Sequence, residues 1–196
     1  AGNMGFSAAE LALGCLEGSS PKPDWVVMEM SSYQIEAATD VAPRIGIWTT
    51  LTPDHLERHG SIDAYRAIKR GLLERSELAI LNGDDPDISR TRRSWGQTRV
   101  NWVSTNHLSK DSASSRLSIS SDGWVCEGKR RLFAAEALAM PGEHNRQNML
   151  LVTAAALEAG LAPDTIDSAL RCFDGVPHRL ESLGTVQGIP VFNDSK

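Results

Sequence analysis

The sequence predicts an α/β fold: a mostly parallel sheet flanked by helices, with a small antiparallel hairpin region. Two compact apolar runs, residues 25–30 and 44–49, are bounded by turn formers or proline and have the length of buried parallel strands. A helical pattern over residues 62–74 separates the second run from a third at 78–81. Strand, helix and strand in this order imply a right-handed crossover between parallel strands.

The other elements are justified by spacing and by turn residues. Apolar positions near the beginning of the chain recur at helical spacing, and glycine or proline residues punctuate the later segments. The remaining expected elements are a helix over residues 6–16, a turn and helix start at 82–86, a fourth strand at 100–103, and helices at 145–158 and 164–173.

The segment 104–121 has two interpretations. Eight of its 18 residues are serine, which is typical of a disordered linker. Residues 116–120 instead alternate between apolar and polar side chains, and Asp122 and Gly123 form a turn signal before residues 124–126. We favour an antiparallel hairpin over the linker.

Composition excludes several classes of protein. A net charge of −5 argues against a nonspecific nucleic-acid binder, which needs a clustered basic face. The three cysteines, Cys15, Cys126 and Cys172, are too few and too scattered for a disulfide framework or a Cys-x-x-Cys metal site. No apolar run approaches the roughly 20 residues that a membrane-spanning helix needs. We therefore expect a soluble cytoplasmic protein without membrane insertion. Because the sequence opens without an initiator Met and stops directly after a strand-like run, we also expect an internal segment of a longer chain.

One strand-to-helix corner concentrates polar chemistry. Residues 52–60 read Thr-Pro-Asp-His-Leu-Glu-Arg-His-Gly, and Tyr65 and Lys69 follow on the expected helix. In α/β proteins the carboxyl ends of strands and the amino ends of helices meet at such corners, where phosphates, metals and substrates bind. The segment predicts a metal or phosphate site.

Glu29 is a candidate ligand for Mg2+. It stands at the end of the expected strand over residues 25–30, and Ser31 and Ser32 follow it. Mg2+ prefers oxygen ligands and usually keeps some of its water. The alternative is a surface glutamate followed by a serine that caps a helix.

His55 and His59 are four residues apart, a spacing that places both rings on one face of a helix, as in zinc sites. Pro53 and Gly60 argue against a continuous helix, and no third ligand has convincing spacing. Structural zinc is therefore the weaker reading.

Lys69 and Asn145 each have two readings. Lys69 lies beside Arg66 and Arg70, so it is either an exposed charge or, if buried near a metal, a neutral amine able to react with carbon dioxide to form a carbamate. Residues 142–148 begin a helix. Either the amides and asparagines at the beginning of this helix face a ligand, or Asn145 simply caps the helix.

Seven short motifs occur in the order found in the Mur ligases, and they extend across essentially the whole chain. The chain resembles this family, and residues 29–36, Glu-Met-Ser-Ser-Tyr-Gln-Ile-Glu, resemble the member that adds D-glutamate. The motifs are residues 2–5, 29–36, 54–59 continuing to Lys69, 82–85, 142–148, 178–181 and 193–196.

The resemblance implies part of a three-domain cytoplasmic enzyme of peptidoglycan synthesis, monomeric when full length. Residues 1–177 would be an incomplete central ATP-binding domain, whose phosphate-binding loop lies upstream, and residues 178–196 the first strand of a C-terminal Rossmann-like domain. The implied reaction joins D-glutamate to UDP-N-acetylmuramoyl-L-alanine through an acyl phosphate, with ATP as co-substrate and Mg2+ as cofactor.

The resemblance also implies roles for individual residues. Glu29 and His55 match metal and substrate ligands, and Lys69 matches the lysine that is carbamylated to hold a second Mg2+; these three are the expected catalytic residues. Glu57, where relatives often have Asp, is a mild departure. The other matches are Asn3 and Ser31 near the muramoyl substrate, Asn145 and Asn148 at the adenine, and Arg179, Asp194 and Lys196 at the ribose and phosphates.

The sequence contains no Gly-x-x-x-x-Gly-Lys-Ser/Thr loop, which would hold the β- and γ-phosphates. We therefore expect the isolated segment to have no ligase activity. Two alternatives stay open: another amide ligase of the Mur or folylpolyglutamate-synthase type, sharing the metal corner but not residues 31–36, and a noncatalytic binding module.

Overall fold

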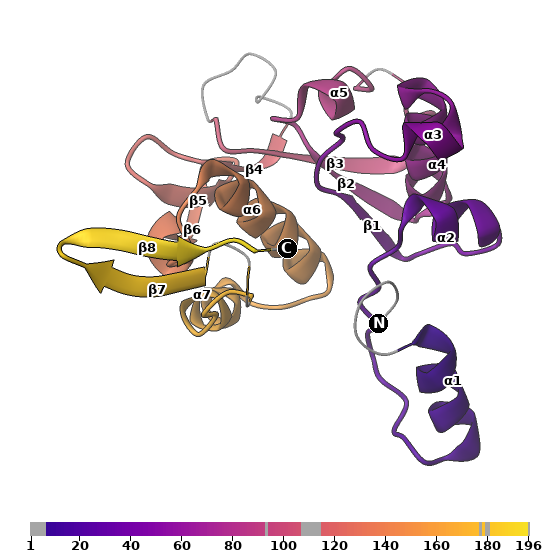
Figure 1. The fold of residues 1–196 in the computed structure, drawn as a ribbon, viewed down its shortest axis with the longest axis horizontal. Helices are drawn as coiled ribbons and strands as arrows, with labels where there is room; N and C mark the ends of the chain where they lie inside the picture. Colours follow the sequence, from indigo (N-terminus) through magenta and orange to yellow (C-terminus); the bar gives the residue numbers. More distant parts are fainter. Residues whose placement is uncertain (1–6, 93, 107–114, 177, 179–180, 196) are drawn as a thin grey trace. The chain divides into compact units, whose positions relative to one another are not determined.

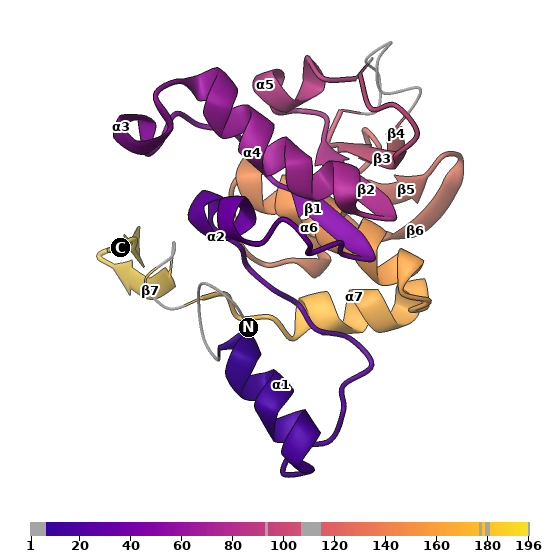
Figure 2. The same ribbon diagram turned by 90° about the vertical axis from the view of Figure 1, so that its right-hand side faces the viewer.

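The structure is a computed structural model that describes residues 7–92, 94–106, 115–176, 178 and 181–195. The chain divides into two compact units. The first comprises Ala1–Pro43 and Thr52–Ser76, and the second Arg44–Leu51 and Glu77–Lys196. Figure 1 shows the elements along the chain, and Figure 2 shows them turned by 90°.

The second unit is built on a six-stranded sheet. Its strand order is β1-β2-β3-β4-β5-β6, so each strand neighbours the next along the chain. Strands β1 to β4 are mutually parallel, and β5 and β6 are antiparallel to the strands before them. The strands are β1 (Ile45–Trp48), β2 (Leu78–Asn82), β3 (Arg99–Ser104), β4 (Ser115–Ile119), β5 (Trp124–Glu127) and β6 (Arg130–Ala134).

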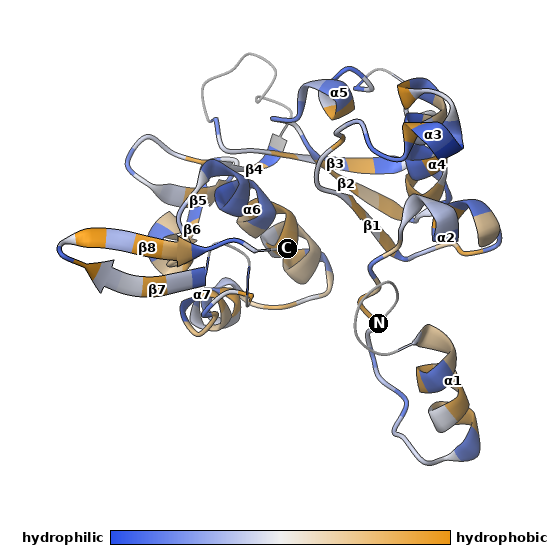
Figure 3. Cartoon of the chain, in the orientation of Figure 1, coloured by the Kyte–Doolittle hydropathy of each residue, from blue (hydrophilic) through white to orange (hydrophobic). Residues whose placement is uncertain are grey.

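Helices of the same unit bury this sheet. Helix α6 (Glu143–Glu158) contacts β1, β2, β3 and β4, whereas α7 (Pro163–Arg171) contacts β6 and the short helix η2 (Ala135–Ala137). All five residues of β2 are buried, as expected for a central parallel strand, and β1 and β2 carry apolar colours in Figure 3. Each fully buried Leu or Ile side chain contributes roughly 1.5–3 kcal/mol. The core includes Ile80, Val103, Leu117, Val125, Leu150 and Leu151.

Three described helices of the first unit begin at serine caps. The side-chain oxygens of Ser7, Ser31 and Ser61 accept hydrogen bonds from backbone amides in the first turns of α1, α2 and α4. Gly18, with φ 72°, ends α1 in the left-handed conformation that glycine adopts without strain. The helices are α1 (Ala8–Glu17), α2 (Ser32–Ala37), α3 (Leu56–His59) and α4 (Ile62–Arg75), and α4 contacts α2 and α3.

The strand predicted at residues 25–30 is wrong. The segment forms no regular strand, Glu29 lies in a single isolated bridge, and Val27 is 85% exposed. An apolar run becomes a buried parallel strand only when neighbouring strands and helices cover it. No strand of the first unit's described residues pairs along this run, so its apolar character alone does not make it a strand.

The other expected elements are confirmed with small shifts at their ends. The serine-rich segment leads into an antiparallel β4–β5 hairpin, in agreement with the hairpin interpretation, and β4 also joins the edge of the parallel strands. Residues 107–114 of that segment lie outside the described part of the chain. The predicted fold class, a mostly parallel α/β sheet with an antiparallel hairpin region, is therefore confirmed.

The last described residues form an antiparallel pair, β7 (Glu181–Val186) and β8 (Ile189–Asn193), in a separate two-stranded sheet. The sequence led us to expect one strand there, whereas the structure has two. The proposed domain boundary between residues 177 and 178 stays a prediction. None of the described helices has the length and apolar character needed to cross a membrane.

Candidate functional site

Four aromatic rings gather around the predicted corner of the first unit. Tyr33 of α2 contacts His55 edge-on, with ring centroids 5.2 Å apart, and lies tilted against His59 at 5.6 Å. His59 stacks on Tyr65 of α4 at 5.4 Å, with 29° between the ring planes. We call Tyr33, His55, His59 and Tyr65 the ring cluster. It joins α2, α3 and α4, three elements that the sequence separates.

Lys69 lies at the edge of the ring cluster. It follows Tyr65 by one helical turn, and its Nζ atom is 5.0 Å from the centroid of the Tyr65 ring. A cation over an aromatic face is attracted by the ring quadrupole. The structure thus brings two predicted site residues, His55 and Lys69, to one set of contacting rings.

His55 has an unusual backbone. Its φ of 52° and ψ of 32° place it in the left-handed region, just before α3 begins at Leu56. This conformation costs a non-glycine residue roughly 1–2 kcal/mol. The imidazole lies between two carboxylates, with Nε2 3.5 Å from Asp54 and Nδ1 3.9 Å from Glu57. Since His55 precedes the helix, it does not share a helical face with His59.

Metal donors are present in this unit but not assembled. Among the described residues, no group of three or more His, Cys, Asp or Glu side chains could hold a metal ion. Glu29 is exposed, and its carboxylate has no hydrogen bond or ion pair with any described side chain. Its oxygens are therefore available to a hard cation, and a carboxylate is a donor type that Mg2+ prefers, whereas the imidazole of His55 is a softer nitrogen donor.

Ser31 caps α2 and is partly buried. Its Oγ accepts from the Gln34 amide at 3.3 Å, and the Gln34 side chain accepts from the Ser31 amide at 2.8 Å. This reciprocal capping box fixes the turn that follows Glu29. The helix-cap alternative for the serines after Glu29 is confirmed, and it leaves the predicted substrate role of Ser31 as a prediction.

A second group of polar side chains lies beyond the carboxyl ends of β1, β2 and β3 in the second unit. Asn82 Nδ2 donates to the Thr49 carbonyl at 2.8 Å and to Gln147 Oε1 at 3.0 Å. The Asp85 carboxylate accepts from Thr50 Oγ1 and the Leu51 amide, both at 2.9 Å, and it also caps α5 (Pro86–Ser89). These bonds fasten the loop after β1 to the end of β2.

Asp84 makes the corresponding link from β2 to β3. It accepts from Ser104 Oγ at 2.5 Å and from the Thr105 amide at 2.7 Å. Thr105 Oγ1 also contacts Asp84 and Glu143, the first residue of α6. The motif at residues 82–85 therefore joins three strand ends to the beginning of α6, a role that the sequence alone did not reveal.

The predicted adenine residues lie at that end of α6. Asn145 is buried, and its Nδ2 donates to the Pro141 carbonyl at 2.7 Å, whereas Asn148 is exposed one turn later. The cap-like contact of Asn145 leaves its side-chain oxygen without a described partner. An adenine role for either residue stays a prediction.

The two last motifs meet in the β7–β8 region. Asn193 Nδ2 lies 2.9 Å from His178 Nδ1 and 3.3 Å from Glu181 Oε2, and the His178 amide donates to the same Glu181 oxygen at 3.0 Å. Asp194 is exposed beside this cluster. Asn3, Arg179 and Lys196, which the resemblance also assigned to binding, lie outside the described residues.

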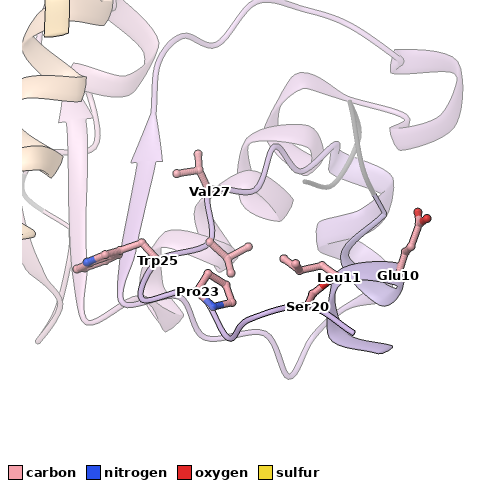
Figure 4. A pocket seen from close by; sticks show the side chains of 7 residues that line it. Glu10, Leu11, Ser20, Pro23, Trp25 and Val27 are labelled. Carbon is pink, nitrogen blue, oxygen red and sulfur yellow. The ribbon is translucent and has the colours of Figure 1, made fainter. Parts of the chain in front are cut away.

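A pocket of about 470 Å3 lies in another part of the first unit, between α1 and the segment that follows it. Figure 4 shows its lining, which contains none of the predicted site residues. The residues that line it are Glu10, Leu11, Ser20, Pro23, Trp25, Val26 and Val27.

The chain has a parallel sheet, and hydrogen-bonded polar side chains lie at the carboxyl ends of its strands. Its sequence also contains a corner rich in histidine and carboxylate. These features define an α/β domain of the class that binds ligands at strand ends. The Mur ligase middle domain family matches residues 7–156. The chain therefore belongs to the Mur ligase family.

Relatives with known names are similar to this chain along its whole sequence. Proteins named UDP-N-acetylmuramoylalanine--D-glutamate ligase from Synechococcus sp. (strain CC9605) and Prochlorococcus marinus (strain MIT 9313) are 65% and 57% identical over 195 residues. These matches cover 100% of this chain and 42% of each relative, so the chain spans about two fifths of their length.

Solved structures support the fold alone. The structure of a UDP-N-acetylmuramoyl-L-alanyl-D-glutamate--2,6-diaminopimelate ligase has a TM-score of 0.66 at 20% identity and covers 82% of this chain and 34% of its own. MurC from Thermotoga maritima has a TM-score of 0.60 at 22% identity, covering 85% of this chain and 37% of its own.

Proposed function

We propose that this chain is the central part of an ATP-dependent ligase that joins D-glutamate to UDP-N-acetylmuramoyl-L-alanine in peptidoglycan synthesis. The observation that carries the proposal is 65% identity, over the whole of this chain, to a relative with that name. The segment Glu-Met-Ser-Ser-Tyr-Gln-Ile-Glu at residues 29–36 supports the choice of D-glutamate within the family.

The reaction proceeds in two steps. A substrate carboxylate attacks the γ-phosphate of ATP and forms an acyl phosphate with release of ADP. The amine of D-glutamate then attacks the acyl carbon, and phosphate leaves as the amide bond forms. Because a carboxylate is a poor acyl donor, the first step supplies the leaving group that the second step needs.

Glu29, His55 and Lys69 are the proposed catalytic and metal-holding residues, with Lys69 as a carbamate. Bound Mg2+ would neutralise the negative charge that gathers between the two substrates. The Glu29 carboxylate has no hydrogen bond or ion pair with any described side chain, which supports its role. For His55 and Lys69 the support is their shared ring cluster, which holds both side chains in defined places.

The remaining proposed contacts divide between the two substrates. Asn3, Ser31 and His55 would face the muramoyl substrate, and the capping box fixes the backbone around Ser31. Asn145 and Asn148 would contact adenine from the beginning of α6, which the bonds of Asp84 and Thr105 tie to the strand ends. The other proposed nucleotide contacts are Arg179, Asp194 and Lys196.

The full-length gene product would act in the cytoplasm as a monomer. Assaying it with ATP, UDP-N-acetylmuramoyl-L-alanine and a panel of acceptor amino acids tests the proposal. Release of phosphate that depends on D-glutamate is expected. Dependence on another acceptor would indicate a different amide ligase, and no Mg2+-dependent nucleotide binding would indicate a noncatalytic module.

The purified 196-residue chain should show no turnover in the same assay, because it carries no Gly-x-x-x-x-Gly-Lys-Ser/Thr loop for the phosphates. Measurable turnover by this chain alone would contradict the proposal that the reaction needs such a phosphate-binding loop.

A further inference from the structure

We infer that His59 is a positioning residue that holds the side chains of His55 and Lys69 through the rings of Tyr33 and Tyr65. The inference rests on the proposed function, which gives His55 and Lys69 their roles. It concerns a histidine to which neither the motif resemblance nor the proposed reaction assigns a function.

His59 is anchored from one side. Its Nε2 lies 3.0 Å from the hydroxyl of Ser32, which is the first residue of α2 and only 2% exposed. Helix α3, which ends at His59, has four residues, and Gly60 follows with φ 76°. So short a helix is weakly held by its own backbone bonds. The hydrogen bond to α2 therefore fixes both the ring and the end of α3.

The anchored imidazole then contacts two tyrosine rings. It stacks on Tyr65 with centroids 5.4 Å apart and lies tilted against Tyr33 at 5.6 Å. Ring pairs at these separations contribute about 0.5–1.5 kcal/mol beyond the area that they bury. Tyr65 is 6% exposed and sits within α4, so the stack limits the rotation of its ring.

Each tyrosine ring contacts one predicted site residue. The Lys69 amine is 5.0 Å from the Tyr65 centroid, and the His55 ring meets Tyr33 edge-on at 5.2 Å. Within the described part of the chain, no carboxylate forms an ion pair with Lys69. The ring contact orients the amine without occupying it, whereas an ion pair would have to break before the amine could react.

Two substitutions separate the hydrogen bond from the stacking. H59F keeps a flat ring on Tyr65 but loses the bond to Ser32, and H59A loses both. S32A removes the same hydrogen bond from the other side. If the bond acts through His59, combining S32A with H59F will be no worse than either change alone. S168A is the matched control, because its hydroxyl donates to a helix carbonyl, that of Asp164, at 2.8 Å.

The experiment uses the full-length gene product with 13C-labelled lysine, and the NMR spectra are recorded without carbon dioxide so that Lys69 is a free amine in every variant. Protons above an aromatic ring resonate upfield, so NMR of the Lys69 ε-methylene group, assigned with K69R, reports its place over Tyr65. H59A should move this signal toward that of a solvent-exposed lysine and lower kcat about tenfold, with KM for ATP unchanged within about twofold. H59F and S32A should give smaller shifts in the same direction, and S168A none.

An unmoved Lys69 signal in H59A would overturn the inference, whatever the activity. If H59A fails to fold, S32A decides: a shifted signal supports the positioning role, and an unshifted one refutes it. The NMR result does not depend on turnover. A protein without D-glutamate ligase activity would therefore contradict the proposed function while the Lys69 signal still tested the role of His59.

Discussion

The two units differ in what holds their polar residues in place. In the second unit, Asn82, Asp84 and Asp85 are fastened by several hydrogen bonds each, beside a sheet whose central strand is wholly buried. In the first unit, the side chains of His55 and Lys69 contact tyrosine rings, His59 of the same ring cluster is bonded to Ser32, and the His55 side chain is 43% exposed. The proposed metal-holding residues thus lie in a different unit from the residues with the most hydrogen bonds.

The contrast shows two ways in which polar side chains can be held within a unit. Several hydrogen bonds to one carboxylate fix the position of that side chain. Stacked rings restrict the positions of neighbouring side chains but leave the nitrogen and oxygen atoms of those side chains available to a ligand. Local strain at His55 fits the same division, since strained backbone gathers at functional sites. The predictions below test this division between the two units.

The largest expected effect is on the core of the second unit. Leu150 of α6 is fully buried against the sheet, so Leu150→Ala removes apolar burial and leaves a cavity, costing about 2–5 kcal/mol of unfolding free energy. Leu16 of α1 is 86% exposed, and Leu16→Ala should change stability by less than about 0.5 kcal/mol. Denaturant unfolding of both variants measures the contrast, which equal losses would refute.

Asp85 should come next. Asp85→Ala removes the cap of α5 together with the bonds to Thr50 and Leu51, and we expect a loss of about 2–3 kcal/mol. Asp85→Asn keeps one carbonyl oxygen and should lose less. Equilibrium denaturation measures both variants. An Asp85→Ala protein as stable as the unchanged chain would show that this linkage is not what holds the strand ends together.

Alanine substitutions at two glycines should have smaller effects on stability, and the two effects should be opposite in sign. A Cβ atom at Gly83 would lie 2.9 Å from the Val103 carbonyl oxygen, which belongs to β3 and cannot yield easily, so Gly83→Ala should cost about 1–3 kcal/mol. At Gly71 within α4 the nearest atom, at 3.3 Å, is the end of the flexible Arg75 side chain. Gly71→Ala should stabilise the chain by about 0.5–1 kcal/mol. Melting curves that move in the same direction for both would contradict this assignment.

The last expected effect on stability depends on pH. Glu158 accepts hydrogen bonds from Arg116 at 2.7 Å and from Arg99 at 2.5 Å. The bond from Arg116, more than the one from Arg99, holds the pKa of Glu158 below its ordinary value of 4.5, against the opposing effect of burial. Because the folded chain has the lower pKa, the stabilisation is fully present above pH 4.5 and is lost as the pH falls through the folded value.

Glu158→Gln should therefore lower stability by about 1 kcal/mol at neutral pH and have little effect once the carboxyl is protonated. Urea denaturation at several pH values measures the difference between the two proteins. A difference that stays constant down to low pH would contradict the pKa assignment.

Local sequence patterns predicted most of the fold. The strands at β1, β2 and β3 and the helices α4 and α6 were expected because apolar spacing and turn residues specify them directly. The strand predicted at residues 25–30 was wrong because the composition of a segment does not show whether a neighbouring strand is present. The join of β4 to β3 could not be predicted either, since pairing between distant strands leaves no local pattern.

The candidate site was predictable in part. Motif order indicated His55 and Lys69 as candidates, but not that Tyr33 and Tyr65 contact them, because ring contacts depend on how three helices pack. The links from Asp84 and Asp85 to residues about 20 to 35 positions away were equally invisible in the sequence. Residue types thus indicated the chemistry, and packing determined which side chains meet.

Lys69 provides the most direct test of the central claim that the corner of the first unit performs amide ligation. In the full-length gene product, Lys69→Ala should lower D-glutamate-dependent phosphate release at least about a hundredfold, and a short-chain carboxylic acid, replacing the lost carbamate oxygens, should restore part of it. Phosphate release by Lys69→Ala at the unchanged protein's rate, without added acid, would contradict the account.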